Sequence, residues 1–171
     1  RSHLPSWRKH ISYKKSVSAI KKKGGGVLLE LSHEIDLIKY LFGNFEVKNS
    51  LLTNSKSLDI NVEERADIIL QLKNKVPASL LLDFNSKLNE RRMIINFSSR
   101  TIDVDLKNNL FKVVGGKVVK TIHFSRAKEN MFINQIKYFI DSKNFSESYD
   151  NASYVLKKIC EIKNKNSVYD K

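Results

Sequence analysis

The chain has 171 residues, and 41% of them are hydrophobic, which is enough apolar material for the packed core of one domain. This composition excludes an intrinsically disordered chain, and no apolar run approaches the roughly 18–20 residues of a membrane span. Lysine and arginine outnumber aspartate and glutamate by 31 to 18, so the formal net charge is +13.

The basic charge raises the question of a nucleic-acid partner. The sequence has no interleaving of aromatic and basic residues, no zinc-ligand spacing and no recognition-helix pattern, so we do not expect nucleic acid to be its partner. An anionic small molecule, or general lysine richness, explains the charge as well. The single cysteine, Cys160, excludes an internal disulfide and fits a reducing, cytoplasmic compartment.

Residues 1–23 are expected to be mostly irregular, with one short helical turn between Ser16 and Ile20. The proline-punctuated stretch Leu4–Arg8 carries the only tryptophan, Trp7, beside Arg8. A tryptophan with a neighbouring arginine can stack on a sugar and clamp an anion. It can equally close the edge of the core, and the sequence leaves both readings open.

Residues 24–43 are predicted to form one helix, opened by Gly24-Gly25-Gly26 and closed by Gly43. At ~100° per residue, one side of this helix is apolar and faces the core, with Leu28, Leu31, Ile35, Ile38 and Phe42. The opposite side carries Glu30, His33, Asp36 and Tyr40. A histidine within helical reach of two carboxylates suits proton transfer, although such a histidine is also a common structural residue.

Residues 44–125 alternate apolar and polar side chains and are predicted to form a meander of antiparallel strands. Turns are expected at Lys73–Lys75, Ser98–Arg100 and Gly115-Gly116. Two C-terminal helices follow within residues 126–164, at Ala127–Asp141 and Asn151–Asn164. We therefore predict a single α+β domain over residues 1–171, a large open antiparallel sheet with helices on one face. The open sheet face is expected to meet a partner subunit.

Several catalytic signatures do not occur in the sequence. It has no G-x-G-x-x-G fingerprint, no phosphate-binding P-loop and no G-x-S-x-G nucleophile elbow. His33-Glu34 is not followed by a second histidine at metalloprotease spacing, and the other histidines lie in unrelated segments. We therefore expect no metal site, although His33, Glu30 and Asp36 are of the right residue types.

The chain resembles a known family over essentially its whole length, and the most specific part of the resemblance lies in residues 4–43. The stretches concerned are Leu4-Pro5-x-Trp7-Arg8, Tyr13, Gly24-Gly25-Gly26-x-Leu28-Leu29-Glu30-Leu31-Ser32-His33-Glu34-Ile35-Asp36 and Leu41-Phe42-Gly43. Together they look like the C-terminal domain of the glucose-fructose oxidoreductase / inositol dehydrogenase / rhizopine-catabolism oxidoreductase family. Within that family they are most similar to the sugar-modifying dehydrogenases of surface-polysaccharide biosynthesis.

The resemblance implies a two-domain enzyme that transfers a hydride at a carbinol carbon of a sugar or nucleotide sugar. An N-terminal Rossmann domain, which is not in this chain, would hold NAD or NADP. The C-terminal domain would supply an open antiparallel sheet for homo-oligomerisation and a catalytic histidine, which maps to His33. Glu30 lies three residues before His33, where the commoner family motif has an aspartate four residues before, so Asp36 is a rival partner.

The resemblance also implies a substrate-binding set. Its members are Trp7, Arg8, Tyr13, Gly25, Gly26 and Ser32. A histidine with a pKa near neutral suits the removal of a hydroxyl proton, and a carboxylate would fix its tautomer. The glycines would let the backbone approach the ligand. The alternative is a non-catalytic sugar-binding or oligomerisation module of the same fold.

Overall fold

The structure is a computed structural model that describes residues 1–8, 10–123, 128–141 and 146–166. The chain divides into two compact units, which we describe separately. The first unit comprises Arg1–Asn89 and Ser146–Lys171, and the second comprises Glu90–Phe145. The hydrophobic pattern of the sequence does not indicate this division.

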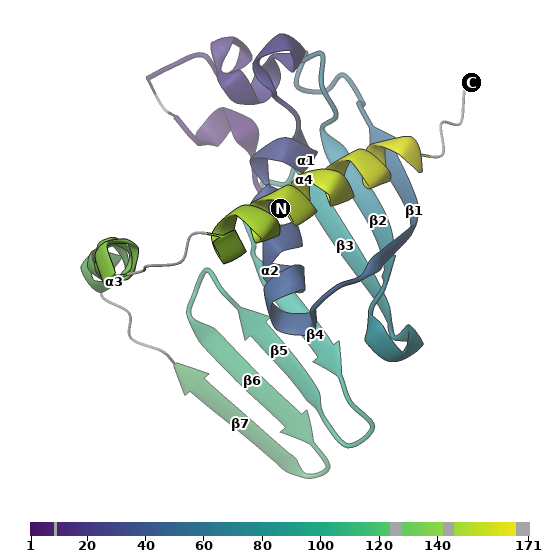
Figure 1. Ribbon diagram of the computed structural model, residues 1–171, viewed down its shortest axis with the longest axis vertical. Helices are drawn as coiled ribbons and strands as arrows, with labels where there is room; N and C mark the ends of the chain where they lie inside the picture. Colours follow the sequence, from purple (N-terminus) through teal and green to yellow (C-terminus); the bar gives the residue numbers. More distant parts are fainter. Residues whose placement is uncertain (9, 124–127, 142–145, 167–171) are drawn as a thin grey trace. The chain divides into compact units, whose positions relative to one another are not determined.

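The first unit is built on a three-stranded antiparallel sheet in the order β1-β2-β3 (Figure 1). Its strands are β1 (Glu46–Thr53), β2 (Arg65–Gln71) and β3 (Pro77–Asp83). The central strand shows why the alternation predicts a half-buried sheet. Ala66, Ile68 and Leu70 are buried, whereas between them Asp67 is only partly buried and Ile69 is exposed.

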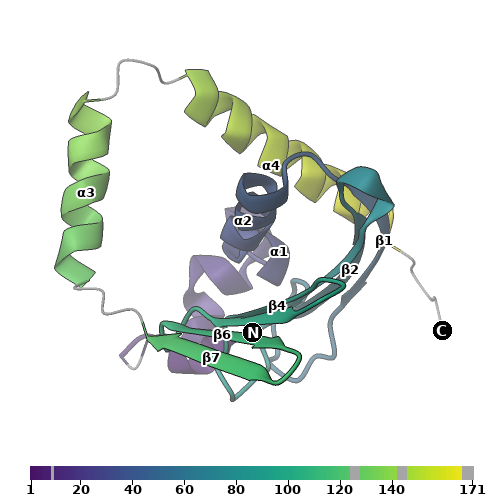
Figure 2. The ribbon, with the colours of Figure 1, turned by 90° about the horizontal axis from the view of Figure 1, so that it is seen from below.

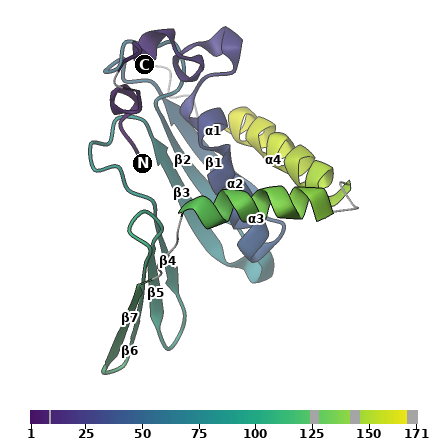
Figure 3. The same ribbon diagram turned by 90° about the vertical axis from the view of Figure 1, so that its left-hand side faces the viewer.

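Three helices lie on one face of this sheet, as Figure 3 shows edge-on. They are α1 (Val27–Glu30), α2 (Ser32–Phe42) and α4 (Ser146–Asn164). The helices and the sheet bury a common core, to which α1 and α2 contribute Val27, Leu28 and Ile35, and α4 contributes Val155, Ile159 and Ile162. The predicted α+β arrangement with helices on one sheet face is confirmed for this unit.

The prediction of one continuous helix over residues 24–43 is wrong in detail. Gly24 and Gly26 have φ values of 80° and 119°, which are not helical, so α1 begins only at Val27. The chain then breaks at Leu31 (φ −104°, ψ 24°), and the Glu34 N–H donates to the Leu31 carbonyl three residues back. Hydrophobic periodicity continues across this break, so the pattern could not reveal it. Glu30 and His33 therefore belong to different helices.

The second unit is a four-stranded antiparallel meander with one helix. Its strands are β4 (Arg92–Asn96), β5 (Thr101–Asp105), β6 (Leu110–Gly115) and β7 (Val118–His123), in that order (Figure 1). Figure 2 shows the same sheet from below, with β7 at one edge. Helix α3 (Lys128–Asp141) follows, and Ala127, where we expected it to begin, lies outside the described residues.

The predicted single large sheet is two antiparallel sheets in the structure. The Phe84 N–H donates to the Glu64 carbonyl and extends the β2–β3 pairing by one residue, and the chain then turns at Asn85, whose N–H donates to the Asp83 carboxylate. Phe84 is fully buried in the first unit. Among the helices of the described residues, none is both long and apolar enough to span a membrane.

Candidate functional site

A groove with a cavity volume of about 890 Å³ lies between α2 and α4 in the first unit. Its apolar wall is formed by Leu29, Ala152, Val155, Leu156 and Ile159. Its polar groups are Ser32, His33, Asp36, Lys39, Tyr40 and Asn151. An apolar wall facing a few polar groups is the usual composition of a small-molecule site.

His33 lies in the first turn of α2 with its side chain 53% exposed. Its Nε2 atom is 3.2 Å from Oε1 of Glu34, whose side chain is only 17% exposed. The imidazole is thus open to a ligand on one side and held by a carboxylate on the other. A histidine in this position can accept or donate a proton at a ligand hydroxyl.

The groove brings together three of the residues predicted from the sequence, Ser32, His33 and Asp36. Asp36 is exposed and lies one helical turn beyond His33. Glu30 is the last residue of α1 and is not part of the groove lining. Of the two predicted carboxylate partners, the groove therefore contains Asp36.

Glu34, Lys39, Tyr40 and Asn151 were not predicted as site residues. Glu34 is adjacent to His33 in sequence, and helical spacing rules direct attention to residues three or four apart. Lys39 and Tyr40 lie on later turns of the same helix, and the period-3.6 pattern had already placed Tyr40 on the side of His33. Asn151 comes from α4, which only tertiary structure could bring to the groove.

Trp7, Arg8 and Tyr13 gather in a separate small hollow of the N-terminal segment. The indole ring of Trp7 lies edge-on to the buried ring of Phe84, with centroids 5.5 Å apart at 87°. The Tyr13 hydroxyl donates to the Leu58 carbonyl at 3.0 Å. Trp7 thus contacts the core, and its side chain remains partly exposed. Contact of these three residues with substrate stays a prediction.

Gly25 and Gly26 are both buried and approach other parts of the chain closely. A Cβ atom at Gly25 would overlap the carbonyl oxygen of Val17, and one at Gly26 would overlap the carboxylate of Glu63. The sequence therefore needs glycine at these two positions for internal packing. Their predicted contact with a ligand stays a prediction.

The described residues do not by themselves fit a whole dinucleotide. Both sheets are antiparallel, whereas a dinucleotide pyrophosphate is bound at a turn of a parallel βαβ unit. Within the described ranges, no three His, Cys, Asp or Glu side chains gather in a way that would hold a metal ion. The groove can supply proton transfer and ligand binding.

Comparison with solved structures identifies proteins of the same fold. KijD10, a 3-ketoreductase from Actinomadura kijaniata in complex with NADP and TDP-benzene, has a TM-score of 0.77 at 10% identity, over 96% of this chain and 51% of that chain. GnnA, a UDP-N-acetylglucosamine 3-dehydrogenase from Acidithiobacillus ferrooxidans, has a TM-score of 0.68 at 16% identity, over 97% and 51%. A putative oxidoreductase from Thermotoga maritima has a TM-score of 0.70 at 15% identity, over 99% and 51%.

The chain thus spans about half the length of these three proteins. Comparison with curated proteins found no match. Residues 6–167 match the family model described as the C-terminal alpha/beta domain of an oxidoreductase family. Because this match covers nearly the whole chain, the protein belongs to the glucose-fructose oxidoreductase / inositol dehydrogenase / rhizopine-catabolism oxidoreductase family, as its C-terminal domain.

Proposed function

We propose that this chain is the substrate-binding and proton-transferring half of an NAD(P)-dependent oxidoreductase that acts on a sugar or nucleotide sugar. The observation that carries the proposal is the half-exposed His33 imidazole, paired with Glu34 in a groove that has one apolar wall. The family match supports oxidoreductase chemistry. The sugar class is supported by neighbours of the same fold, a 3-ketoreductase and a UDP-N-acetylglucosamine 3-dehydrogenase.

The role of His33 follows from what hydride transfer at a carbinol requires. NAD or NADP, held mainly by a domain outside this chain, would supply the hydride acceptor. As the hydride leaves the carbon, the hydroxyl proton must go to a base, and we assign this role to His33 of the groove. The Glu34 carboxylate, 3.2 Å from Nε2 of His33, would orient the imidazole.

The groove has the composition that a sugar requires. Leu156 and Ile159 offer an apolar surface for the C–H face of a pyranose, and Tyr40, Asn151 and Asp36 offer hydrogen-bonding groups for its hydroxyls. We place the protein in polysaccharide biosynthesis by its resemblance to the sugar-modifying branch. The single cysteine, exposed Cys160, suits a cytoplasmic protein.

The test is the substitution His33→Gln in the polypeptide that joins this chain to its nucleotide-binding domain. Loss of the general base should lower kcat by roughly 10²–10⁴ with a small change in KM. His123→Gln, an exposed histidine at the end of β7, is the matched control and should leave kcat unchanged. Glu34→Gln should lower kcat less than His33→Gln does, because Glu34 acts only by orienting the His33 imidazole. An unchanged kcat in His33→Gln would remove His33 from the mechanism.

The alternative is a sugar-binding module without catalysis, and one observation favours it. Every strand pairing among the described residues is antiparallel, so this part of the chain has no dinucleotide site of its own. A module of this kind would bind a sugar ligand in the groove and show no cofactor-dependent turnover in any polypeptide that contains it.

We further propose that the protein assembles with copies of itself through a sheet face. One face of the second sheet is formed by apolar cross-strand rows, Met93–Val104–Phe111–Ile122 and Ile95–Ile102–Val113. These side chains are only half-buried. The second row continues to the exposed Lys120 of β7, which is the one charged residue in these two rows. A mostly apolar face of this kind is stabilised by a covering layer, which an identical face on a second copy would supply. Light scattering of the purified protein measures the resulting mass.

A further inference from the structure

The N-terminal segment, residues 1–23, concentrates positive charge. It holds eight of the 31 lysines and arginines of the chain and no acidic residue. This density exceeds that of the chain as a whole, which has 18 acidic residues among its charges. A segment of one sign of charge attracts anions, and a hollow beside it is where an anion would bind.

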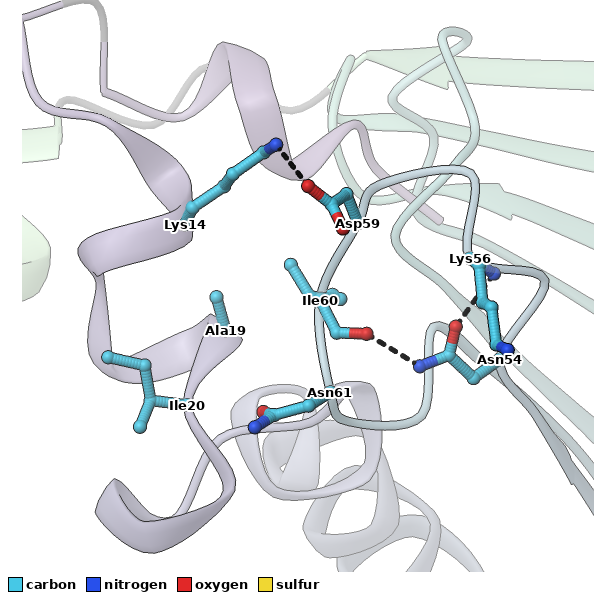
Figure 4. A pocket seen from close by; sticks show the side chains of 8 residues that line it. All are labelled: Lys14, Ala19, Ile20, Asn54, Lys56, Asp59, Ile60 and Asn61. Atoms are coloured by element: carbon cyan, nitrogen blue, oxygen red, sulfur yellow. Dashed lines mark hydrogen bonds and ion pairs between the residues drawn. The ribbon is translucent and has the colours of Figure 1, made fainter.

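Such a hollow lies between the N-terminal segment and the loop that joins β1 to β2, and its cavity volume is about 520 Å³ (Figure 4). The N-terminal segment contributes Lys14, Ala19 and Ile20. The loop contributes Asn54, Lys56, Asp59, Ile60 and Asn61. This volume falls within the range of small-molecule sites and far exceeds what a lone phosphate fills.

The two sides of the pocket are joined by long-range contacts. Lys14 forms an ion pair with Asp59 at 2.6 Å, and the Lys21 N–H donates to Oδ1 of Asn61 at 3.3 Å. The loop itself is braced by Asn54, whose amide donates to the carbonyls of Ile60 at 2.8 Å and Val62 at 2.7 Å. The pocket is therefore preformed, and a ligand would not have to order it.

The charges at the rim leave one cation available. Lys14 and Asp59 neutralise each other, and the hydrogen bond and charge of Lys14 hold the pKa of Asp59 below its ordinary value, so this carboxylate stays ionised and paired. The Lys56 ammonium forms no ion pair or hydrogen bond with any residue that the structure describes. Lys56 has φ 58°, so the loop holds it in a left-handed conformation that is uncommon for lysine.

The remaining groups suit the other parts of a nucleotide. Ile20 is partly exposed and offers the main apolar contact for a planar base, while Ala19 and Ile60 are buried and line the same pocket. The Asn61 side chain accepts from Lys21 through its oxygen, which leaves its amide N–H groups for a base carbonyl. A free sugar has no negative charge to pair with the Lys56 ammonium, and inorganic phosphate has no apolar part to contact the apolar side of the pocket.

We propose that this pocket binds a nucleoside diphosphate, with Lys56 contacting the diphosphate and Ile20 contacting the base. The inference goes beyond the proposed function, because this pocket shares no lining residue with the groove that holds His33.

Calorimetric titration of the 171-residue chain with UDP and TDP tests the proposal. Lys56→Asn removes the charge while keeping a residue that tolerates a left-handed backbone, and it should weaken binding about tenfold or more. Lys75→Asn is the matched control, because Lys75 is also an exposed lysine with positive φ, in the turn between β2 and β3. This control should retain the affinity of the unchanged chain.

Three results would overturn the proposal. They are the lack of UDP and TDP binding at millimolar concentration, equal weakening by Lys56→Asn and Lys75→Asn, and inorganic pyrophosphate binding as tightly as UDP. The titration needs neither cofactor nor turnover, so it separates this inference from the proposed function. If free sugars are oxidised and UDP does not bind, the inference fails alone. If UDP binds and His33→Gln leaves kcat unchanged, the proposed catalytic role fails alone.

Discussion

The buried carboxylate of Glu64 offers a direct test of how the first unit is held together. Glu64 is 0% exposed. Its Oε2 atom accepts from the Ser55 hydroxyl at 2.5 Å, the Ser55 N–H at 3.2 Å and the Asn85 amide at 3.2 Å, and its Oε1 atom accepts from the Leu58 N–H at 3.0 Å. A buried charge of this kind is tolerated only because hydrogen bonds replace its water.

The substitution Glu64→Gln keeps the size of the side chain but turns one acceptor into a donor. In either amide orientation the new NH₂ group faces a backbone N–H, of Ser55 or of Leu58, which then loses its acceptor. An unsatisfied buried donor costs about 1–3 kcal/mol, and the remaining bonds lose their charge assistance. We expect Glu64→Gln to lower the free energy of unfolding by about 2–4 kcal/mol.

The assay is urea unfolding followed by tryptophan fluorescence. Trp7 is the only tryptophan of the chain and lies against Phe84, so its signal reports the first unit, which contains Glu64. Glu63→Gln is the matched control, because Oε1 of Glu63 is buried without a hydrogen-bond partner among the described residues. This control should leave the free energy of unfolding unchanged or raise it, because it neutralises a carboxylate that has one buried oxygen without a partner among the described residues.

The unchanged protein and Glu64→Gln are predicted to differ in how their free energies of unfolding depend on pH. Burial raises the pKa of the Glu64 carboxyl, but hydrogen bonds from Ser55, Leu58, Asn85 and Ser57 outweigh it, so the pKa lies below its ordinary value of 4.5. The charged form is thus favoured by folding. Its contribution is present above pH 4.5 and is lost as the pH falls through the lower folded-state pKa. The unchanged protein should therefore lose stability on acidification more steeply than Glu64→Gln. Equal losses at pH 7 for Glu64→Gln and Glu63→Gln, or parallel acid profiles, would refute the reasoning.

Two further substitutions test packing in the same unit by the same fluorescence assay. Gly25→Ala places a Cβ atom against the Val17 carbonyl oxygen and should lower the free energy of unfolding by about 1–3 kcal/mol. Its control, Gly24→Ala, meets no neighbouring atom and should cost only about 1 kcal/mol, because alanine is strained at the φ of 80°. Equal effects would contradict this packing. Ser50→Ala removes the buried bond from Ser50 Oγ to the Ile162 carbonyl, 2.6 Å long, and should destabilise by about 1–3 kcal/mol. The control Ser79→Ala, at an exposed position of β3, should change the free energy of unfolding by less than about 0.5 kcal/mol. A loss as large as that of Ser50→Ala would show that the hydrogen bond from Ser50 to Ile162 is not the cause of the destabilisation.

Most of the secondary structure could be predicted because the periodicities are local. Alternation at Ala66, Ile68 and Leu70 gave β2, and the turn residues Lys73–Lys75 and Gly115-Gly116 separated the hairpins where the structure has them. The break at Leu31 was missed because a kinked helix can bury the same residues as a straight one. Helix α4 begins at Ser146, five residues before the predicted start at Asn151. The prediction began too late because the first turn of the helix has few apolar residues, so the hydrophobic periodicity does not extend into it.

The candidate site was predictable in part. His33 and Asp36 share the groove because they share a helix face, and that is a property of sequence spacing. Asn151 and Leu156 join them through the packing of α4 on α2, which no local pattern encodes. The pocket beside Lys56 depends on contacts between residues far apart in the sequence, such as Lys14 and Asp59, which are 45 positions apart, so periodicity could not predict it.

The discontinuity of the first unit has a consequence for biosynthesis. Its core needs Val155, Ile159 and Ile162 of α4, but α4 is made only after the whole segment Glu90–Phe145. At typical translation speeds that segment takes roughly 3–11 seconds to synthesise. During this interval the apolar face of β1, β2 and α2 on which α4 will pack has no covering helix. The nascent chain therefore exposes this apolar face while it is still on the ribosome. Chaperones that bind apolar surfaces would bind it there until α4 emerges and covers it.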